Sequence, residues 1–297
     1  MNAALEALIE LLDLEPIEVN IYRGQNEPGS RGRLFGGQVA AQAFAAAART
    51  VEDRAAHSLH SYFLRPGDPS VPIVFNVDRL RDGSSFTTRR VVAVQHGKAI
   101  FNMSVSYHRP EKGYEHQDPM PDAPDLDSLP TWEERMAELA DRIPTQARDW
   151  MASERPIEYR SNEPHGMLAS EPATGPNHVW IRANGALPDD ALLHQCLFVY
   201  ASDMGMVSNI HRPHRTPGRL FFRDVMMASL DHAVWFHRDF RMDEWLLYSQ
   251  ESPVAAGARG FAHATLYTRS GSLVGTVAQE GLMRRIDPEK LGDRSPF

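Results

Sequence analysis

One carboxylate is the first feature of the sequence that could do chemistry. Leu192, Cys196, Val199 and Asp203 recur at helical spacing within PDDALLHQCLFVYASDMGM (188–206), so they share one face of a predicted helix. That face is apolar except for its last member, and a carboxylate at the end of a buried stripe needs hydrogen-bonding partners. Asp203 is therefore either held for structural reasons or acts chemically, and residue type alone favours the structural role.

A second polar side chain lies on an apolar strand face. In the strand predicted over 273–285, Gln279 shares its face with Val277, Gly281 and Met283. A buried amide usually has a hydrogen-bonding partner, which suits both a site residue and a structural role. The pattern by itself favours the structural role.

Other chemical signals in the sequence are weak. His57 is an alternative general base, because histidine is the usual one. His57 and His60 are three positions apart on a predicted strand, which places them on opposite faces and argues against a shared metal ion. We expect no metal site and no bound cofactor, and no G-x-S-x-G motif of a serine hydrolase occurs.

The elements that must position these residues occur twice. Each time a helix precedes a set of strand-like runs bounded by glycine-containing turns. The first set comprises a small-residue helix at 39–50 and runs at 57–65, 73–81, 86–95 and 99–109, and the second comprises the helix at 188–206 and runs at 229–237, 244–252, 258–268 and 273–285. The final hairpins, 89–109 and 259–284, also resemble each other in sequence, which indicates duplication.

The duplication predicts an α+β fold of two units packed side by side, each a curved antiparallel sheet around a central helix. We expect residues 1–115 to form the N-terminal unit and residues 166–297 to form the C-terminal unit. Residues 116–165, rich in prolines and acids, are expected to form a linker that contains a helix.

Composition excludes several classes of partner. The chain has 297 residues, 42% of them hydrophobic, which is sufficient for a full core. A net charge of −8 argues against nucleic acid, since phosphate binding needs a basic surface. The single cysteine suits a reducing compartment, the N-terminus does not resemble a signal peptide and no apolar run could span a bilayer. We therefore expect a cytoplasmic protein without membrane partners.

Several motifs in order along the chain resemble the acyl-CoA thioesterase II family, the bacterial TesB type. The resemblance covers nearly the whole chain and is specific, because many separate motifs match in the same order. The motifs are FGGQVAAQA, HSLHSYFLRPGD, LRDGSSFTTRRVVAVQ, NHVWIRANG, SLDHAVWFHR, DEWLLYSQES, ARGF and TVAQEGLMR. The resemblance implies a double hotdog fold with the active site in the C-terminal unit. It also implies hydrolysis of fatty acyl-CoA to free fatty acid and coenzyme A, without a metal or a covalent intermediate.

The resemblance also implies a catalytic set of aspartate, threonine and glutamine around one water. These positions fall on Asp203, Ser229 and Gln279. Asp203 would act as general base, while the Ser229 hydroxyl and the Gln279 amide would orient the water. Serine at position 229 departs from the expected threonine, because it keeps the hydroxyl but lacks the methyl group that restricts its rotamer. We expect function to survive this change.

The sequence leaves several points open. Backbone N–H groups at Gly36 and Gly37 are candidates for the oxyanion site, but they lie in the N-terminal unit and stay unassigned. The arginines that could contact the phosphates of coenzyme A are Arg33, Arg65, Arg89, Arg259 and Arg284. A homo-oligomer is expected, because hotdog sheets commonly pair. Two alternatives to the thioesterase are a non-catalytic acyl-CoA binding module and a hotdog enoyl-CoA hydratase.

Overall fold

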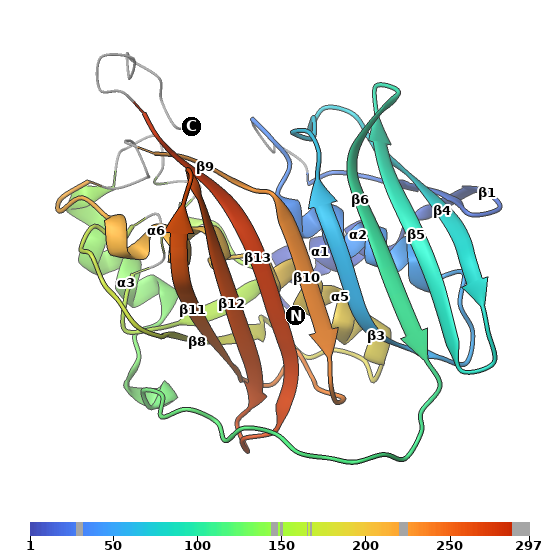
Figure 1. The fold of residues 1–297 in the computed structure, drawn as a ribbon. Helices are drawn as coiled ribbons and strands as arrows, with labels where there is room; N and C mark the ends of the chain where they lie inside the picture. The colour runs from blue at the N-terminus through green and yellow to red at the C-terminus, as the bar shows by residue number, and fades with distance from the viewer. Residues whose placement is uncertain are drawn as a thin grey trace.

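The protein consists of long antiparallel strands that curve around two central helices (Figure 1). The computed structural model describes residues 1–27, 32–143, 148, 151–164, 166, 168–219 and 225–286. Its α-helices are α1 (Ala3–Leu12), α2 (Gly36–Ala48), α3 (Trp132–Leu139), α5 (Ala191–Ser202) and α6 (Met206–His211). Its strands are β1 (Glu15–Glu18), β2 (Ile21–Gly24), β3 (Ala55–Phe63), β4 (Ile73–Asp82), β5 (Phe86–Gln95), β6 (Lys98–His108), β7 (Ile157–Arg160), β8 (Asn177–Ala183), β9 (Val225–Ser229), β10 (Asp231–Phe236), β11 (Leu246–Ala256), β12 (Arg259–Thr268) and β13 (Leu273–Arg285).

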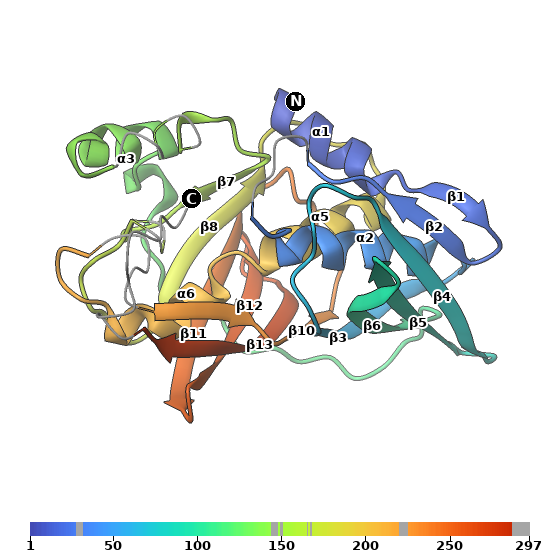
Figure 2. The same ribbon diagram turned by 90° about the horizontal axis from the view of Figure 1, so that it is seen from above.

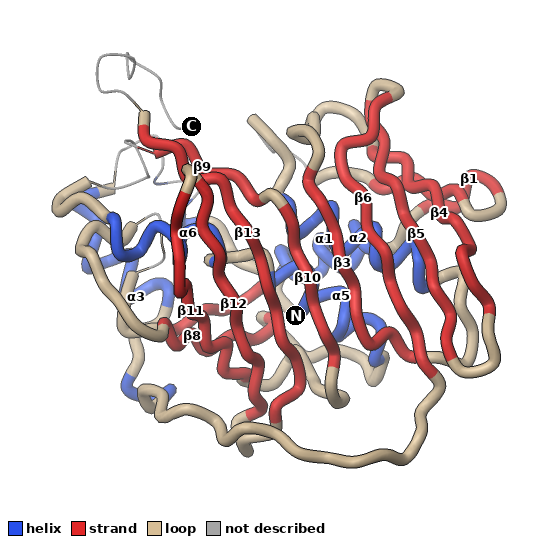
Figure 3. Tube along the Cα trace, viewed as in Figure 1, coloured by secondary structure: helices blue, strands red, loops and turns tan. Residues whose placement is uncertain are grey.

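The two predicted sheets continue into one another. The strand order is β1-β2-β4-β5-β6-β3-β10-β13-β12-β11-β8-β7, and β9 pairs with β13 beside this path (Figure 3). The units meet where β3 pairs antiparallel with β10, with His60 opposite Ala233. Each side of this junction repeats the same strand arrangement, as expected for a duplication. The α+β architecture predicted from the sequence is therefore confirmed, with one continuous sheet in place of two separate ones.

The central helices pack against each other inside the curve of the sheet (Figure 2). In α2 every residue from Gly37 to Ala47 is buried, and most are alanines. Small side chains keep this helix thin, so that strands and α5 can approach it on all sides. Helix α1 covers α2 through its buried leucines, Leu5, Leu8 and Leu12. The core thus runs unbroken across both units.

Helix α5 is shorter than the sequence predicts. Asp190 caps its start by accepting hydrogen bonds from the backbone N–H groups of Leu192 and Leu193, which fits the preference for acids there. The helix ends at Ser202, and the left-handed φ of 90° at Gly205 separates it from α6. Leu192 is 37% exposed, so the predicted buried stripe begins only at Cys196.

The predicted linker contains the expected helix. Helix α3 starts at a capping box in which Thr131 and Glu134 bind each other's backbone N–H groups. Near the end of the same stretch, β7 pairs with β8 and becomes the last strand of the sheet. The division at residues 115 and 165 remains a prediction.

Candidate active site

Asp203 directly follows the last residue of α5. It is the C-cap residue of that helix and only 8% exposed. Its Oδ1 atom accepts hydrogen bonds from Gln279 Nε2 at 3.0 Å and from Ser229 Oγ at 3.3 Å. Among the described residues no hydrogen bond is made to the other carboxylate oxygen, Oδ2. One oxygen is thus fixed by two donors, and the other accepts no hydrogen bond from the described residues.

The side chains of Gln279 and Ser229 complete a compact polar cluster with this acid. Gln279 Nε2 also donates to Ser229 Oγ at 2.7 Å, so the amide holds both partners. Gln279 is fully buried on β13, on the same face as the buried Val277 and Gly281, as the sequence pattern predicts. The structure therefore brings together the three residues that the sequence singles out.

An irregularity between β9 and β10 makes the cluster possible. Ser229 pairs with Gly281 on β13, and Ala233 pairs with Ala278 on the same strand. Between these two pairs the chain of β9 and β10 advances four residues while β13 advances three, so β9–β10 contains one extra residue. Asp231 closes this bulge by accepting the backbone N–H of Glu280 at 2.6 Å. Residues three apart on a regular strand face opposite ways. The bulge turns both Ser229 and His232 to the inner face.

Sequence reasoning missed His232, which supports Gln279 from behind. The imidazole is fully buried, and its Nδ1 lies 2.7 Å from Gln279 Oε1. Its Nε2 lies 2.8 Å from the hydroxyl of Ser202, the last residue of α5. Burial lowers the pKa of His232, although the nearby charge of Asp203 acts in the opposite direction. The signal in the sequence was a histidine in alternation with the apolar Val234 and Phe236, which otherwise marks an inner face.

The start of α2 also lies at this acid. A Cβ placed on Gly36 would come within 2.8 Å of Asp203 Oδ2, and one on Gly37 within 2.4 Å of the Tyr200 carbonyl oxygen. Phe35, the N-cap residue, makes no side-chain cap to the first N–H groups of the helix. Those N–H groups have no acceptor within the helix and carry its positive dipole end. The start of α2, in the predicted N-terminal unit, therefore borders the cluster, whose three residues all come from the predicted C-terminal unit.

The alternative base, His57, lies away from this cluster. A bulge between Ala56 and Ser58 turns its side chain to the outer face of the sheet, where Nε2 binds Ser106 Oγ at 2.8 Å. His60, opposite Ser104, is on that same outer face, so the predicted opposite orientation of the two histidines is wrong. Neither ring reaches the inner face that carries Gln279.

The candidate arginines have very different environments. Arg89 is fully buried and bound to Thr50 and Asp82, so it is not a ligand for coenzyme A. Arg259 pairs with Glu280 on the surface. Arg33, which shortly precedes α2, donates to the backbone oxygen of Met227 at 3.0 Å, two residues before Ser229. Arg33 is thus hydrogen-bonded to β9 near Ser229, and Arg259 is hydrogen-bonded to β13 beside Gln279.

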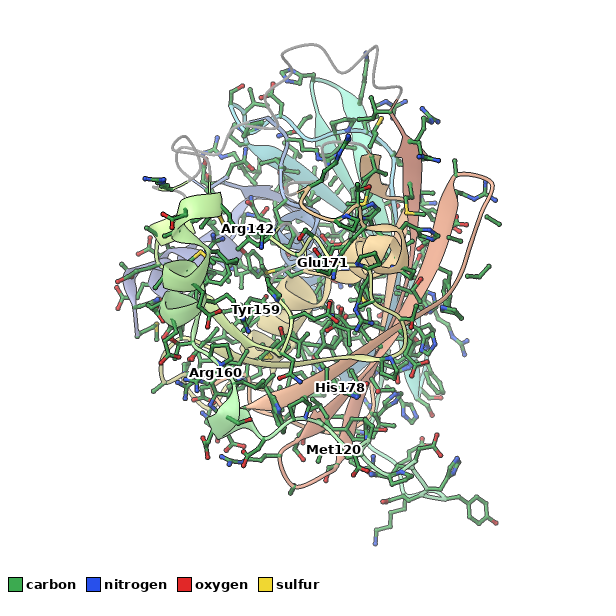
Figure 4. The ribbon with its side chains drawn as sticks, turned by 90° about the vertical axis from the view of Figure 1, so that its left-hand side faces the viewer. Met120, Arg142, Tyr159, Arg160, Glu171 and His178 are labelled. Atoms are coloured by element: carbon green, nitrogen blue, oxygen red, sulfur yellow. The ribbon has the colours of Figure 1, made fainter. Side chains whose placement is uncertain are left out.

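A pocket borders the turn that follows Asp203. Met204 and Gly205 form part of its wall, and the Tyr159 hydroxyl donates to Met204 Sδ at 2.6 Å. Figure 4 views the molecule from this side, with Tyr159 near the centre. Polar groups such as Gln250 contribute much of the lining, and the carboxylate of Asp203 does not.

Within the described ranges, no group of three or more His, Cys, Asp or Glu side chains is arranged to hold a metal ion. The helices of the same ranges include none with the length and apolar character needed to cross a bilayer.

Comparison with known protein families gives matches in both units. Residues 146–282 match a family described as acyl-CoA thioesterase, and residues 26–108 match the acyl-CoA thioesterase N-terminal domain. Acyl-CoA thioesterase 2 of Haemophilus influenzae is 36% identical over 285 residues, 96% of this chain and 99% of that protein. Human acyl-coenzyme A thioesterase 8 is 39% identical over 283 residues, 92% of this chain and 88% of that protein.

Solved structures confirm the fold. An acyl-CoA thioesterase II from Mycobacterium marinum shares 42% identity at a TM-score of 0.76, covering 95% of this chain and 98% of its own. A hot dog fold protein from Alicyclobacillus acidocaldarius reaches a TM-score of 0.75 at 16% identity, covering 97% of this chain and 100% of its own. The latter likeness bears on the fold alone, and the predicted double hotdog architecture is confirmed.

Proposed function

This chain belongs to the acyl-CoA thioesterase family, and we propose that it hydrolyses fatty acyl-CoA with Asp203 as the general base for an attacking water. The single observation that carries the proposal is the Asp203–Ser229–Gln279 cluster, in which one carboxylate oxygen is bound twice and the other is not. In such a cluster a water would receive orientation from the fixed groups and lose its proton to the carboxylate.

The reaction follows from the chemistry of a thioester. The water oxygen bonds to the thioester carbonyl carbon while Asp203 takes its proton, and the carbonyl oxygen becomes an oxyanion. Collapse of this intermediate breaks the carbon–sulfur bond and releases coenzyme A as a thiolate, which takes up the proton from Asp203 and so restores the carboxylate. The products are the free fatty acid and coenzyme A. No covalent enzyme intermediate is required, because the activated water attacks the carbonyl carbon directly.

The oxyanion site that we propose is the start of α2. Its first N–H groups lack intrahelical acceptors, and a Cβ on Gly36, the first residue of the helix, would lie 2.8 Å from Asp203 Oδ2. Preorganised N–H donors of this kind stabilise the charge that develops on a carbonyl oxygen. Both units would then contribute to catalysis, since the C-terminal unit supplies the general base and the N-terminal unit supplies the N–H donors to the oxyanion.

Arg33 is the proposed contact for the phosphates of coenzyme A. Its guanidinium reaches β9 close to Ser229 and carries a positive charge at the surface. A charged guanidinium suits a phosphate, because it donates in a planar fork. The substrate would thus be held at its phosphate end near the strand that carries Ser229.

The test is thiol release from acyl-CoA esters of increasing chain length by the purified chain. We expect turnover for at least one chain length. No thiol release from any short, medium or long acyl-CoA would contradict the proposal and favour a binding module, provided that the esters bind.

Assembly and location are proposed on separate grounds. We propose a homo-oligomer that forms through the sheet, since the edge strand β1 is exposed at every position and unpaired edges invite strand pairing. Light scattering after size-exclusion chromatography would report the mass, and a monomer at micromolar concentration would contradict this. The proposed cytoplasmic location is tested by cell fractionation.

A further inference from the structure

We propose that His232 is a positioning residue for the hydrolysis, acting through the orientation of the Gln279 amide. The inference rests on the proposed function, because it assigns His232 a task in that same site. The proposal is based on a series of buried, hydrogen-bonded side chains that runs from Ser202 through His232 and Gln279 to Asp203. Ser202, His232 and Gln279 are all fully buried.

The hydrogen bonds of this chain have a defined direction. Gln279 donates from Nε2 to both Asp203 Oδ1 and Ser229 Oγ, so its Oε1 is left as an acceptor only. His232 Nδ1 lies 2.7 Å from that oxygen and must therefore carry the proton. The neutral ring then accepts at Nε2 from the Ser202 hydroxyl, 2.8 Å away, and in this state that hydroxyl gives up its 3.1 Å hydrogen bond to the Val199 carbonyl oxygen. The histidine tautomer and the amide orientation thus specify each other.

The alternative orientation of the amide would oppose the proposed chemistry. A rotated Gln279 would turn its carbonyl oxygen toward the Asp203 carboxylate, replacing two donated hydrogen bonds with the contact of two acceptors. The rotated N–H₂ would meet the N–H of His232. The Asp203 carboxylate and the Nδ1–H form of His232 therefore both favour the amide orientation that holds Asp203 and Ser229.

The other unit shows that the fold does not need this polar chain. The two units meet where β3 pairs with β10, so β3 and β6 of the N-terminal unit correspond to β10 and β13 of the C-terminal unit. In this correspondence SLHSYF (58–63) aligns with DHAVWF (231–236). In that alignment Leu59 stands in the place of His232. Val105, directly opposite Leu59, stands in the place of Gln279. Both apolar residues are fully buried. Polar groups buried at this position of one unit alone therefore point to a role in the reaction rather than in folding.

The experiment compares His232→Leu with His232→Asn in the full chain. Leucine fills the corresponding position of the other unit, whereas asparagine carries an N–H₂ donor at the same distance from the backbone as Nδ1. Thiol release is measured over a range of acyl-CoA concentrations. His60→Leu, on the outer face of the adjacent strand, is the matched control for loss of a histidine.

For His232→Leu we expect kcat to fall about tenfold or more with KM changed less than about twofold, because substrate contacts remain. His232→Asn should recover most of the lost kcat, and His60→Leu should behave as the wild type. Wild-type kcat in a folded His232→Leu, or an Asn variant as slow as the Leu variant, would overturn the inference. Absence of wild-type turnover would instead overturn the proposed function.

A second measurement does not depend on activity. Nitrogen-15 NMR of the histidine rings in the wild type distinguishes the ring protonated at Nδ1 from the commoner form protonated at Nε2. The inference requires the Nδ1–H form for His232, with its signal identified by loss in His232→Asn. A ring that carries its proton on Nε2 alone would overturn the inference even if His232→Leu does not fold.

Discussion

Gln279 donates a hydrogen bond of 3.0 Å to Oδ1 of Asp203, although 76 positions of the sequence separate them. The amide comes from β13 in the sheet, and the carboxylate from the end of the helix that the sheet encloses. Because the contact joins sheet to helix, it fixes one oxygen of the acid in place. The other oxygen faces the start of α2 from the opposite unit. This asymmetry determines what each substitution should do.

Asp203→Asn should abolish most of the activity while preserving the fold. Asparagine is nearly the same size but cannot take a proton from water, so we expect kcat to fall by about a hundredfold or more. Thiol release at saturating acyl-CoA measures the loss, and thermal unfolding checks the fold. A variant with near wild-type kcat would move the general base to another residue.

Ser229 tests whether a hydroxyl is what the site requires at this position. Ser229→Ala removes the donor to Asp203 Oδ1 and the acceptor for Gln279, so we expect kcat to fall about tenfold or more. Ser229→Thr keeps the hydroxyl and restricts its rotamer, and should retain activity. We would measure kcat for both variants in parallel. An equal loss of kcat in both would contradict a requirement for the hydroxyl at this position.

Gln279→Leu should reduce both activity and stability. The substitution keeps the approximate volume but removes the donors to Asp203 and Ser229 and the acceptor for His232. Leaving one buried partner unsatisfied costs about 1–3 kcal/mol, so the free energy of unfolding should fall by about that amount. Urea unfolding measures this change, and kcat should fall about tenfold or more. Unchanged stability would mean that these hydrogen bonds contribute little net energy.

Gly36→Ala probes the approach of α2 to the acid. The added methyl group would lie 2.8 Å from Asp203 Oδ2 and 2.8 Å from Phe63, so it would displace the carboxylate or exclude the water. We expect kcat to fall about tenfold or more. Gly113→Ala is the matched control, because a Cβ there meets nothing within 4 Å. If both variants keep wild-type kcat, the start of α2 is not part of the site.

Stability should decline as pH falls below the ordinary histidine pKa of 6.5. Burial lowers the pKa of His57, His178, His194, His232 and His237 in the folded chain. The unfolded chain therefore takes up protons first, between 6.5 and the lowered values, which favours unfolding there. The carboxyl of Glu163, whose pKa the fold lowers from 4.5, affects stability only at lower pH. Urea unfolding at pH 7.5 and 5.5 should show lower stability at pH 5.5, and equal stability would contradict this expectation.

The sequence by itself determined the kinds of element and the chemical residues. Alternation of apolar residues indicated the long strands of both units but not the short β1, β7 and β9. The alanines of α2 indicated a helix that a sheet could enclose, because these patterns depend on near neighbours in the chain. Asp203 and Gln279 stood out as polar groups on apolar faces, and the family resemblance added Ser229.

Only the tertiary structure decided how these residues meet. The bulge between Ser229 and His232 reverses the face that regular alternation would give, and so does the bulge at His57. The place of Gly36 at Asp203 depends on how the two units pack across β3 and β10. Such contacts arise between residues far apart in the chain, where local periodicity carries no information about which atoms come together.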